Sequence, residues 1–241
     1  MPLENQISLA DMGIVAITFD LDDTLWPCAP VIKAAEQVYF DWIDSRFPEI
    51  THQYSHADMI AMRRSLLSAE PLLKNDVTEL RRRATVSLMQ PFGASDVDIA
   101  EAMQVCIDAR QQITFYAEVL TALQQLSFHY RLGSITNGNA SLQAIGVGHL
   151  FDVELAATME LPAKPAPDMF LRACEVLGTQ PDRVLHVGDH PENDVAAARM
   201  VGCKTAWITR TSEQYPEDSA PADLAIVDLN ELVELAPPIP G

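Results

Sequence analysis

The sequence predicts an α/β fold in which helices cover both faces of a parallel sheet and an all-helical unit is inserted into that core. From about residue 116 onward, short apolar runs alternate with segments of helical periodicity, which is the pattern of a covered parallel sheet. One more apolar run, at residues 14–19, is separated from the others by a long helical stretch. We therefore expect a core formed by residues 12–27 and 116–236, and a helical cap domain at residues 28–115.

The apolar, β-branched run at residues 14–19 predicts the first buried strand. Asp20 and Asp22 follow it directly, at the edge of the sheet where open α/β folds bind their ligands. Two carboxylates held side by side can divide labour: one stays ionised as nucleophile and metal ligand, and the other acts as general acid and base. The alternative is an ordinary turn at the end of a strand, because aspartate is common in turns.

The inserted stretch has apolar residues at helical spacing. The pattern predicts helices at residues 31–47, 56–69, 76–89 and 95–110. Pro48, Pro71 and Pro91 fall between these segments, where helix boundaries are expected. Ser95 is followed by acidic residues, which suits a capped helix start with negative charge near the positive end of the helix dipole.

The remaining elements alternate along the chain. We expect helices at residues 116–126, 141–147, 168–177 and 193–201, and strands at residues 131–136, 153–156, 184–187, 205–208 and 224–227. Residues 213–222 read as a polar, proline-containing loop, and residues 237–241 as a frayed tail.

Polar residues also stand at the ends of later strands. Thr136, Asn137 and Gly138 offer a hydroxyl, an amide and a glycine that lets backbone N–H groups approach an anion, although an ordinary Asn-Gly turn is the alternative. Lys164 is fixed between prolines ahead of a helix, which favours a defined role over that of a solvated surface charge.

Two acids follow the apolar run at residues 184–187. Asp189 and Asp194 can complete a magnesium site, because Mg²⁺ prefers oxygen ligands and keeps several of its waters. Each of these motifs is weak alone. Their order, with each at a strand terminus, is much more specific.

At this point the chain resembles the haloacid dehalogenase-like hydrolase superfamily over residues 14–235. The segments that carry the resemblance are residues 20–24, 136–138, 164–165 and 188–194. The resemblance implies a Rossmann-like sheet, and the place of the helical insertion is similar to the first type of cap domain in that superfamily. It also implies an enzyme that cleaves phosphate monoesters.

The resemblance assigns the two acids that follow the first strand. Asp20 attacks phosphorus and forms an aspartyl-phosphate. Asp22 protonates the leaving oxygen and then activates the water that hydrolyses the phosphoenzyme. Asp23 has no implied catalytic role, and we expect it to form the turn. Relatives that displace halide need no acid for the leaving group and typically lack a carboxylate at the second position, so Asp22 favours phosphoryl transfer over dehalogenation.

The same resemblance implies the rest of the site. Thr136, with the Asn137 and Gly138 amides, holds the phosphoryl oxygens, and Lys164 pairs with Asp20 and the phosphoryl group. The implied cofactor is Mg²⁺, held by the Asp20 carboxylate, the backbone carbonyl of Asp22, and Asp189. Asp194 is expected to act from behind these ligands, by orienting a metal-bound water or the lysine.

The expected function is Mg²⁺-dependent hydrolysis of a small phosphate monoester. The segment at residues 75–83, together with residues 136–139 and 185–189, looks similar to a branch of bacterial phosphatases that act on flavin mononucleotide and a phosphoribityl-aminouracil intermediate of riboflavin synthesis. At most one or two arginines of residues 81–83 can face the cleft, and a solvated helix face is the alternative. Trp26 either stacks on a planar substrate group or packs at the hinge. A phosphomutase, a 2-haloacid dehalogenase and a non-catalytic binding module remain alternative functions.

Composition limits the partners. The formal net charge of −18 argues against nonspecific binding to nucleic acid or to anionic membranes. The four cysteines are scattered without a metal-binding spacing, which favours reduced thiols. Residues 1–5 lack the basic start and the apolar core of a signal peptide, and no run is long and apolar enough to span a bilayer. We expect a cytoplasmic monomer or homodimer whose partner is a small phosphate ester.

Overall fold

A six-stranded parallel sheet forms the core of the part of the chain that the computed structural model describes, residues 8–210 and 215–237. The strands are β1 (Ala16–Phe19), β2 (Arg131–Thr136), β3 (Val153–Ala156), β4 (Val184–Gly188), β5 (Lys204–Ile208) and β6 (Leu224–Ile226). Their order is β3-β2-β1-β4-β5-β6, which confirms the Rossmann-like fold and the strands predicted from the apolar runs. The predictions for residues 1–5, 213–214 and 238–241 lie outside the described residues.

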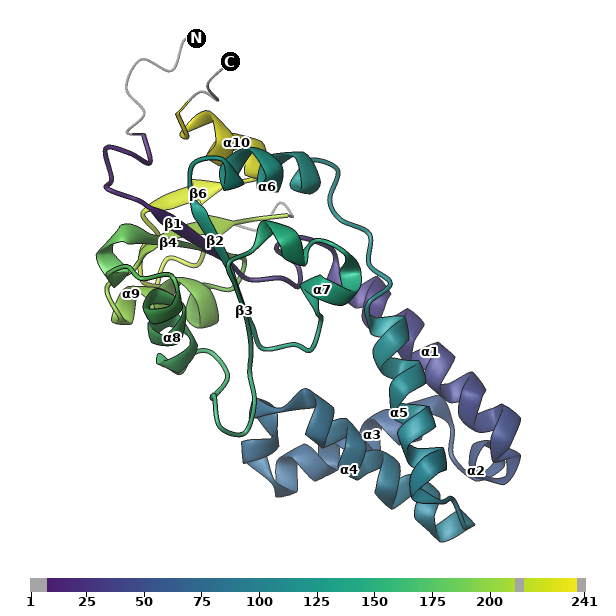
Figure 1. The fold of residues 1–241 in the computed structure, drawn as a ribbon. Helices are drawn as coiled ribbons and strands as arrows, with labels where there is room; N and C mark the ends of the chain where they lie inside the picture. The colour runs from purple at the N-terminus through teal and green to yellow at the C-terminus, as the bar shows by residue number, and fades with distance from the viewer. Residues whose placement is uncertain (1–7, 211–214, 238–241) are drawn as a thin grey trace.

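Helices cover both faces of the sheet (Figure 1). On one face, α6 (Val119–Ser127), α7 (Leu142–Ile145) and α10 (Leu229–Glu234) contribute to a large apolar cluster with the side chains of Ile17 and Phe19. On the other face, α8 (Asp168–Val176) and α9 (Ala197–Met200) pack with a second cluster. Because β1 and β4 are buried along their whole length, they read in the sequence as largely apolar runs, interrupted by Thr18 and His186.

The strand order creates a switch point beside β1. From β1 the chain moves to β2 and β3 on one side, and then crosses to β4, β5 and β6 on the other. Phe19, the last residue of β1, is paired with Ser134 of β2 and Val187 of β4. The residues that follow β1 and β4 therefore meet at the crevice where open α/β sheets bind ligands.

Five α-helices are inserted between β1 and β2, and Figure 1 shows them gathered to one side of the sheet; we call them the cap helices, or the cap, after the predicted cap domain. They are α1 (Cys28–Arg46), α2 (Pro48–Gln53), α3 (His56–Ala69), α4 (Val77–Met89) and α5 (Asp96–Arg110), with single 3₁₀ turns at Pro71–Asn75 and Gln90–Phe92. They share an apolar cluster of their own. The assignment of residues 28–115 to a separate domain stays a prediction.

The predicted helix boundaries hold where local capping sets them. Pro48 and Pro71 each occupy the first turn of a new element, and Ser95 forms a capping box with Asp98 at the start of α5. Helix α1 begins at Cys28 instead of residue 31, because a proline in the first turn, here Pro30, interrupts no helical hydrogen bond.

Other boundaries depend on distant contacts. Helix α6 begins at Val119 instead of residue 116, and the Tyr116 N–H that precedes it is bonded to the Leu25 carbonyl. The helix predicted at residues 193–201 is divided into a short π-helix, η5 (Pro191–Ala196), and α9. Helices α2 and α10 and the two 3₁₀ turns were not predicted. Among the described helices, none has the length and apolar character needed to cross a membrane.

A buried ion cluster lies inside the cap helices. The carboxylate of Glu36, on α1, accepts hydrogen bonds from the guanidinium groups of Arg63 and Arg81. Burial raises the pKa of Glu36, but the hydrogen bonds and charges of the two arginines outweigh it and hold this pKa below its usual range. The cluster ties α1 to α3 and α4, which are adjacent in the cap.

The arginine run at residues 81–83 is used within the cap. Arg81 pairs with Glu36, whereas Arg82 and Arg83 pair with Glu79 at the surface. These pairings agree with the expectation that at most one or two of the three arginines can face the cleft. For Arg82 and Arg83, the alternative of a solvated helix face is confirmed.

The first prediction concerns the stability of the cap. Glu36→Gln should lower the free energy of unfolding by about 3 kcal/mol at pH 7, because it removes the buried charge that compensates two partly buried arginines. The folded-state pKa of Glu36 lies below its unfolded value of about 4.3, so its contribution is complete above that pH and is lost as the pH falls through the folded pKa. Denaturant unfolding at pH 7 and pH 3 measures both effects.

The matched control is Glu175→Gln, which breaks an exposed pair with Arg172 and should cost about 0.5 kcal/mol or less. Equal losses in the two variants, or a difference between wild type and Glu36→Gln that does not shrink at pH 3, would contradict the prediction.

Candidate active site

Asp20 lies in the crevice beside the switch point. It is the first residue after β1, its N–H donates to the Val187 carbonyl at 2.8 Å, and its side chain is largely buried. The Lys164 ammonium, from the loop between β3 and α8, donates to Asp20 Oδ1 at 2.6 Å. Two residues far apart in the sequence thus form a buried ion pair at the end of the central strand.

The Lys164 ammonium is fully engaged. Besides Asp20, it donates to Asp194 Oδ1 at 2.6 Å and to the Ile135 carbonyl at 2.9 Å. An ammonium has three N–H donors, and each of them has an acceptor here. The charges of the two aspartates therefore hold the pKa of Lys164 above its usual range in spite of burial.

Asn137 positions the lysine. Its Oδ1 accepts from the Lys164 N–H at 2.7 Å, and its Nδ2 donates to the Lys164 carbonyl at 2.9 Å. The side-chain amide thus makes one donated and one accepted hydrogen bond with the backbone of Lys164, as the backbone of a neighbouring strand can. The sequence singled out Asn137 for its backbone N–H, and its side chain fixes the loop after β3 against the end of β2.

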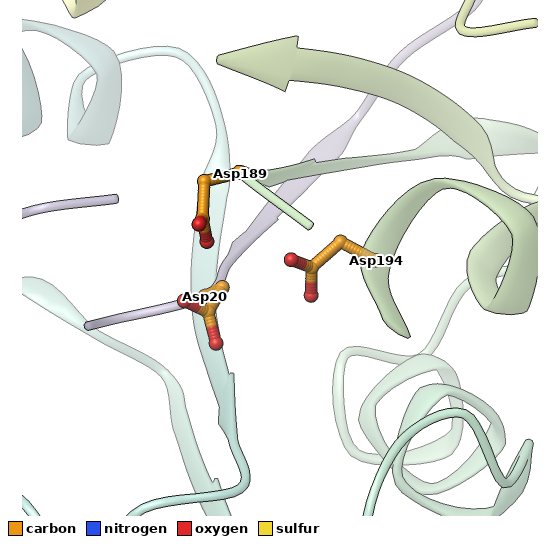
Figure 2. Close-up of side chains that lie close together, drawn as sticks. All are labelled: Asp20, Asp189 and Asp194. Carbon is orange, nitrogen blue, oxygen red and sulfur yellow. The ribbon is translucent and has the colours of Figure 1, made fainter. Parts of the chain in front are cut away.

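Three carboxylates converge on one point. Figure 2 shows Asp20 and Asp189 beside each other and Asp194 opposite them, and one oxygen from each lies within 4.8 Å of the others. Asp189 follows β4 and accepts a hydrogen bond from the Thr24 hydroxyl at 3.4 Å, while Asp194 lies in η5. Oxygen donors gathered in this way are the ligands that Mg²⁺ and similar hard cations prefer.

The cluster carries more negative charge than its own cation balances. Burial raises the pKa of Asp20 to about 8, although the Lys164 charge opposes it, and burial together with the Asp194 charge raises the pKa of Asp189 to about 7. For Asp194, burial is outweighed by Lys164 and by His186, and its pKa lies well below the usual range. A divalent cation beside Asp20 and Asp189 would favour their ionised forms.

His186 holds Asp194 from behind. Its Nε2 lies 3.2 Å from Asp194 Oδ1, and its Nδ1 lies 2.9 Å from the Thr18 hydroxyl. Burial lowers the pKa of His186, so the neutral ring donates from Nε2 and accepts from the Thr18 hydroxyl at Nδ1. Sequence reasoning assigned His186 no role, although a histidine within an apolar strand was a visible signal.

Gly188 is required for this arrangement. A Cβ atom at position 188 would lie 2.3 Å from Asp194 Cγ, so any other residue would overlap the carboxylate. The π-helical turn of η5 brings Asp194 to this point, and the His190 N–H donates to Asp194 Oδ2 at 2.9 Å. The bare backbone of β4 therefore permits the close approach of the third carboxylate.

Asp22 belongs to a different group of contacts. Arg110 Nη2 donates to both of its carboxylate oxygens at 2.6 Å, and Trp26 Nε1 donates to Oδ1 at 2.9 Å. Trp26 is fully buried and packs edge-on against Phe115, so the packed alternative for this aromatic is confirmed. Sequence reasoning missed Arg110, because an arginine at the end of a helix is an ordinary feature.

The turn after β2 packs against Asp22. The Gly138 N–H donates to the Thr136 hydroxyl at 3.0 Å, and a Cβ at position 138 would lie only 2.8 Å from Asp22 Oδ2. The structure therefore brings the predicted phosphoryl-binding residues next to the predicted acid and base. The side chain of Asp22 is not part of the carboxylate cluster, and the role of its carbonyl as a ligand stays a prediction.

Asp23 forms the turn that leads into the cap. Its φ of 59° lies in the left-handed region, which aspartate tolerates better than most residues. Its Oδ1 accepts from the Cys28 N–H, at the start of α1, at 2.8 Å. This confirms the structural role that the sequence predicts for Asp23.

The cap meets the core above the turn after β2. Asn139 Nδ2 donates to the Thr78 hydroxyl at 3.1 Å, and the Ala163 N–H donates to Asn75 Oδ1 at 3.1 Å. A cavity of about 480 Å³ lies here, lined by Thr78 from the cap and by Gly138 and Asn139 from the core. A larger cavity, of about 630 Å³, is lined wholly by cap residues and contains none of the predicted catalytic groups. The predicted catalytic side chains do not line the smaller cavity either, but its lining includes Gly138 of the turn after β2, which makes it the better candidate for substrate.

The fold and the site match a known family. A hydrolase family model, described as haloacid dehalogenase-like hydrolase, matches residues 14–202. The chain belongs to this family. The membership confirms the resemblance inferred from the strand-end motifs and the expectation of an enzyme.

Relatives from this family differ in their named activities. The 5-amino-6-(5-phospho-D-ribitylamino)uracil phosphatase YigB of Escherichia coli (strain K12) is 32% identical over 81% of this chain and 83% of its own length. Phosphoglycolate phosphatase of Shigella boydii serotype 4 is 28% identical over 91% of each chain. A crystal structure described as 2-haloacid dehalogenase from Pseudomonas syringae pv. Tomato DC3000 superimposes with a TM-score of 0.85 at 32% identity, over 92% of this chain and 97% of its own.

Proposed function

We propose that this protein is a Mg²⁺-dependent phosphohydrolase that cleaves a small phosphate monoester through an aspartyl-phosphate. The observation that carries the proposal is the buried pair of Asp20 and Lys164 beside the switch point, with two further carboxylates converging on it. The similarity to named phosphatases supports the same activity.

The donor set fits a magnesium ion. The carboxylates of Asp20 and Asp189, with the backbone carbonyl of Asp22, would hold it, and all of these ligands are oxygens. When bound, the ion supplies positive charge that offsets the carboxylates and the phosphoryl oxygens. Asp194 is bonded to Lys164 and His186, and its role is to hold the lysine in place.

Asp20 is the nucleophile. Its carboxylate oxygen forms a bond to phosphorus while the bond from phosphorus to the ester oxygen breaks, and Asp22 donates a proton to that oxygen. In the second half of the reaction, water attacks phosphorus and gives a proton to Asp22. The bond between phosphorus and the Asp20 oxygen breaks, so that free Asp20 and inorganic phosphate are formed. Lys164 favours the ionised form of Asp20 by its charge and fixes the direction from which the carboxylate attacks.

The turn after β2 binds the phosphoryl group. The Thr136 hydroxyl accepts from Gly138, so its own proton remains available for a phosphoryl oxygen. Asn137 contributes its backbone N–H, since its side chain is committed to Lys164. Lys164 has already used its three donors, and its contribution to the phosphoryl group is one of charge.

The substrate is a phosphate of the riboflavin pathway, either flavin mononucleotide or the phosphoribityl-aminouracil intermediate. The relative named for the second compound supports this choice, as does the likeness of residues 75–83 to that branch. Within this segment Asn75 accepts from the core at Ala163, and Thr78 lines the smaller cavity, where it can contact the part of the ester beyond the phosphate.

A dehalogenase is the second candidate, favoured by the similarity to the structure described as one. In that reaction halide would leave without a proton. Asp22 then has no task, although the fold holds its carboxylate with Arg110 and Trp26. This arrangement favours a leaving group that must be protonated, and therefore an ester.

The nucleophile is tested by Asp20→Asn. Phosphate release should fall by at least about a thousandfold, because the amide cannot attack phosphorus. The control is Asp23→Asn, which makes the same change of charge in the turn and should stay close to wild type. Unchanged turnover by purified Asp20→Asn would remove Asp20 from the mechanism.

The metal is tested by chelation. EDTA should stop phosphate release and added Mg²⁺ should restore it, since the single charge of Lys164 cannot balance three convergent carboxylates and a phosphate group. Mg²⁺ should also raise the unfolding temperature of wild type more than that of Asp189→Asn. Activity that persists in EDTA would refute the metal requirement.

The substrate is tested by a panel of flavin mononucleotide, the phosphoribityl-aminouracil, phosphoglycolate, sugar phosphates, nucleotides and 2-chloropropionate. We expect phosphate release to be fastest with one of the first two, and no chloride release, because Asp22 is arranged to protonate an oxygen. Chloride release without phosphate release would establish the dehalogenase instead.

A further inference from the structure

Arg110 is a cap residue whose side chain reaches the catalytic crevice. It is the last residue of α5, its side chain is 3% exposed, and its Nη2 donates to both oxygens of Asp22 at 2.6 Å. Its Nη1 is buried and has no hydrogen-bond partner among the described residues. A charged group at the site thus keeps one donor unused.

Burying Arg110 Nη1 costs free energy unless an acceptor binds it. A buried donor without a partner costs about 1–3 kcal/mol, and more when the group is charged. Lys164, the other cation in the crevice, has an acceptor for each of its N–H groups. Arg110 is therefore better placed than Lys164 to offer a new hydrogen bond to an incoming anion.

The guanidinium lies beside the turn that we assign to the phosphoryl group. A Cβ built on Gly138 would lie 3.5 Å from Arg110 Nη2 and 3.3 Å from the Thr136 hydroxyl. The same point is 2.8 Å from Asp22 Oδ2. Arg110, Asp22 and the Thr136 hydroxyl therefore lie close to one another around Gly138. Planar guanidinium groups bind phosphate and carboxylate oxygens by paired hydrogen bonds.

We propose that Arg110 is a substrate-binding residue, whose Nη1 donates to a phosphoryl oxygen of the ester while Nη2 keeps the Asp22 carboxylate turned toward the leaving oxygen. The inference rests on the proposed phosphohydrolase function and adds a positive charge from the cap to the phosphate site. Since Arg110 is at the junction of α5 with the core, the cap supplies a catalytic group as well as a cover.

The test is the binding of inorganic phosphate to the Mg²⁺-loaded protein by calorimetry, together with kcat and KM for the best ester of the panel. Arg110→Met should raise both the Kd for phosphate and the KM at least about tenfold, which corresponds to about 1.4 kcal/mol. Arg110→Gln, which can still donate to Asp22, should raise them similarly and serves if the methionine variant does not fold. Arg110→Lys should recover part of the affinity, because it keeps the charge but loses the fork.

The matched control is Arg81→Met, which removes a partly buried arginine that is paired with a carboxylate in the cap. It should lower stability and leave the Kd for phosphate unchanged. Wild-type Kd and KM in the folded Arg110 variants would overturn the proposal, and so would a fall in kcat alone, since Arg110 would then act only through Asp22. Phosphate binding is measured without turnover, so a wild-type protein that binds phosphate through Arg110 but hydrolyses no ester would refute the proposed function and not this site.

Discussion

The rest of the site depends on one interaction, the buried pairing of the Lys164 ammonium with the carboxylates of Asp20 and Asp194. Removing three charged groups from water is expensive, and their attraction compensates only when the geometry is fixed and the remaining hydrogen bonds are made. The fold meets both conditions. Asn137 binds the lysine backbone from the end of β2, and the Ile135 carbonyl accepts the third N–H.

The same ion cluster explains why polar residues run through the middle of the sheet. Thr18 and His186 occupy neighbouring strands in register, β1 and β4, and would be unfavourable in an apolar core without partners. Their hydrogen bonds form a chain that ends on Asp194. The centre of the sheet therefore exchanges some apolar packing for rigidity at the switch point, where the position of a carboxylate must be fixed to a fraction of an ångström.

The strands and their terminal motifs could be predicted because both signals are local. An apolar run is visible in the sequence, and the polar residue after it marks the carboxyl edge of the sheet. Arg110 and His186 could not be assigned in this way, because their partners, Asp22 and Asp194, are set by tertiary contacts. Two other features also depend on contacts that the local pattern does not show. The residues just before α6 are bonded to the backbone at Leu25, and the arginines at residues 81–83 pair with acids within the cap.

The absence of a side chain at Gly188 restricts how this sequence can diverge. The space that a methyl group would fill is occupied by Asp194, and Asp194 reaches that space because η5 is wound as a π-helix. A descendant that acquires a larger residue at position 188 must rewind the following turn at the same time, and one that straightens the turn withdraws the lysine's second counter-ion. Room for a larger residue at position 188 is therefore gained only by giving up the contact between Asp194 and Lys164, so this strand end keeps its ion pair only while position 188 remains glycine.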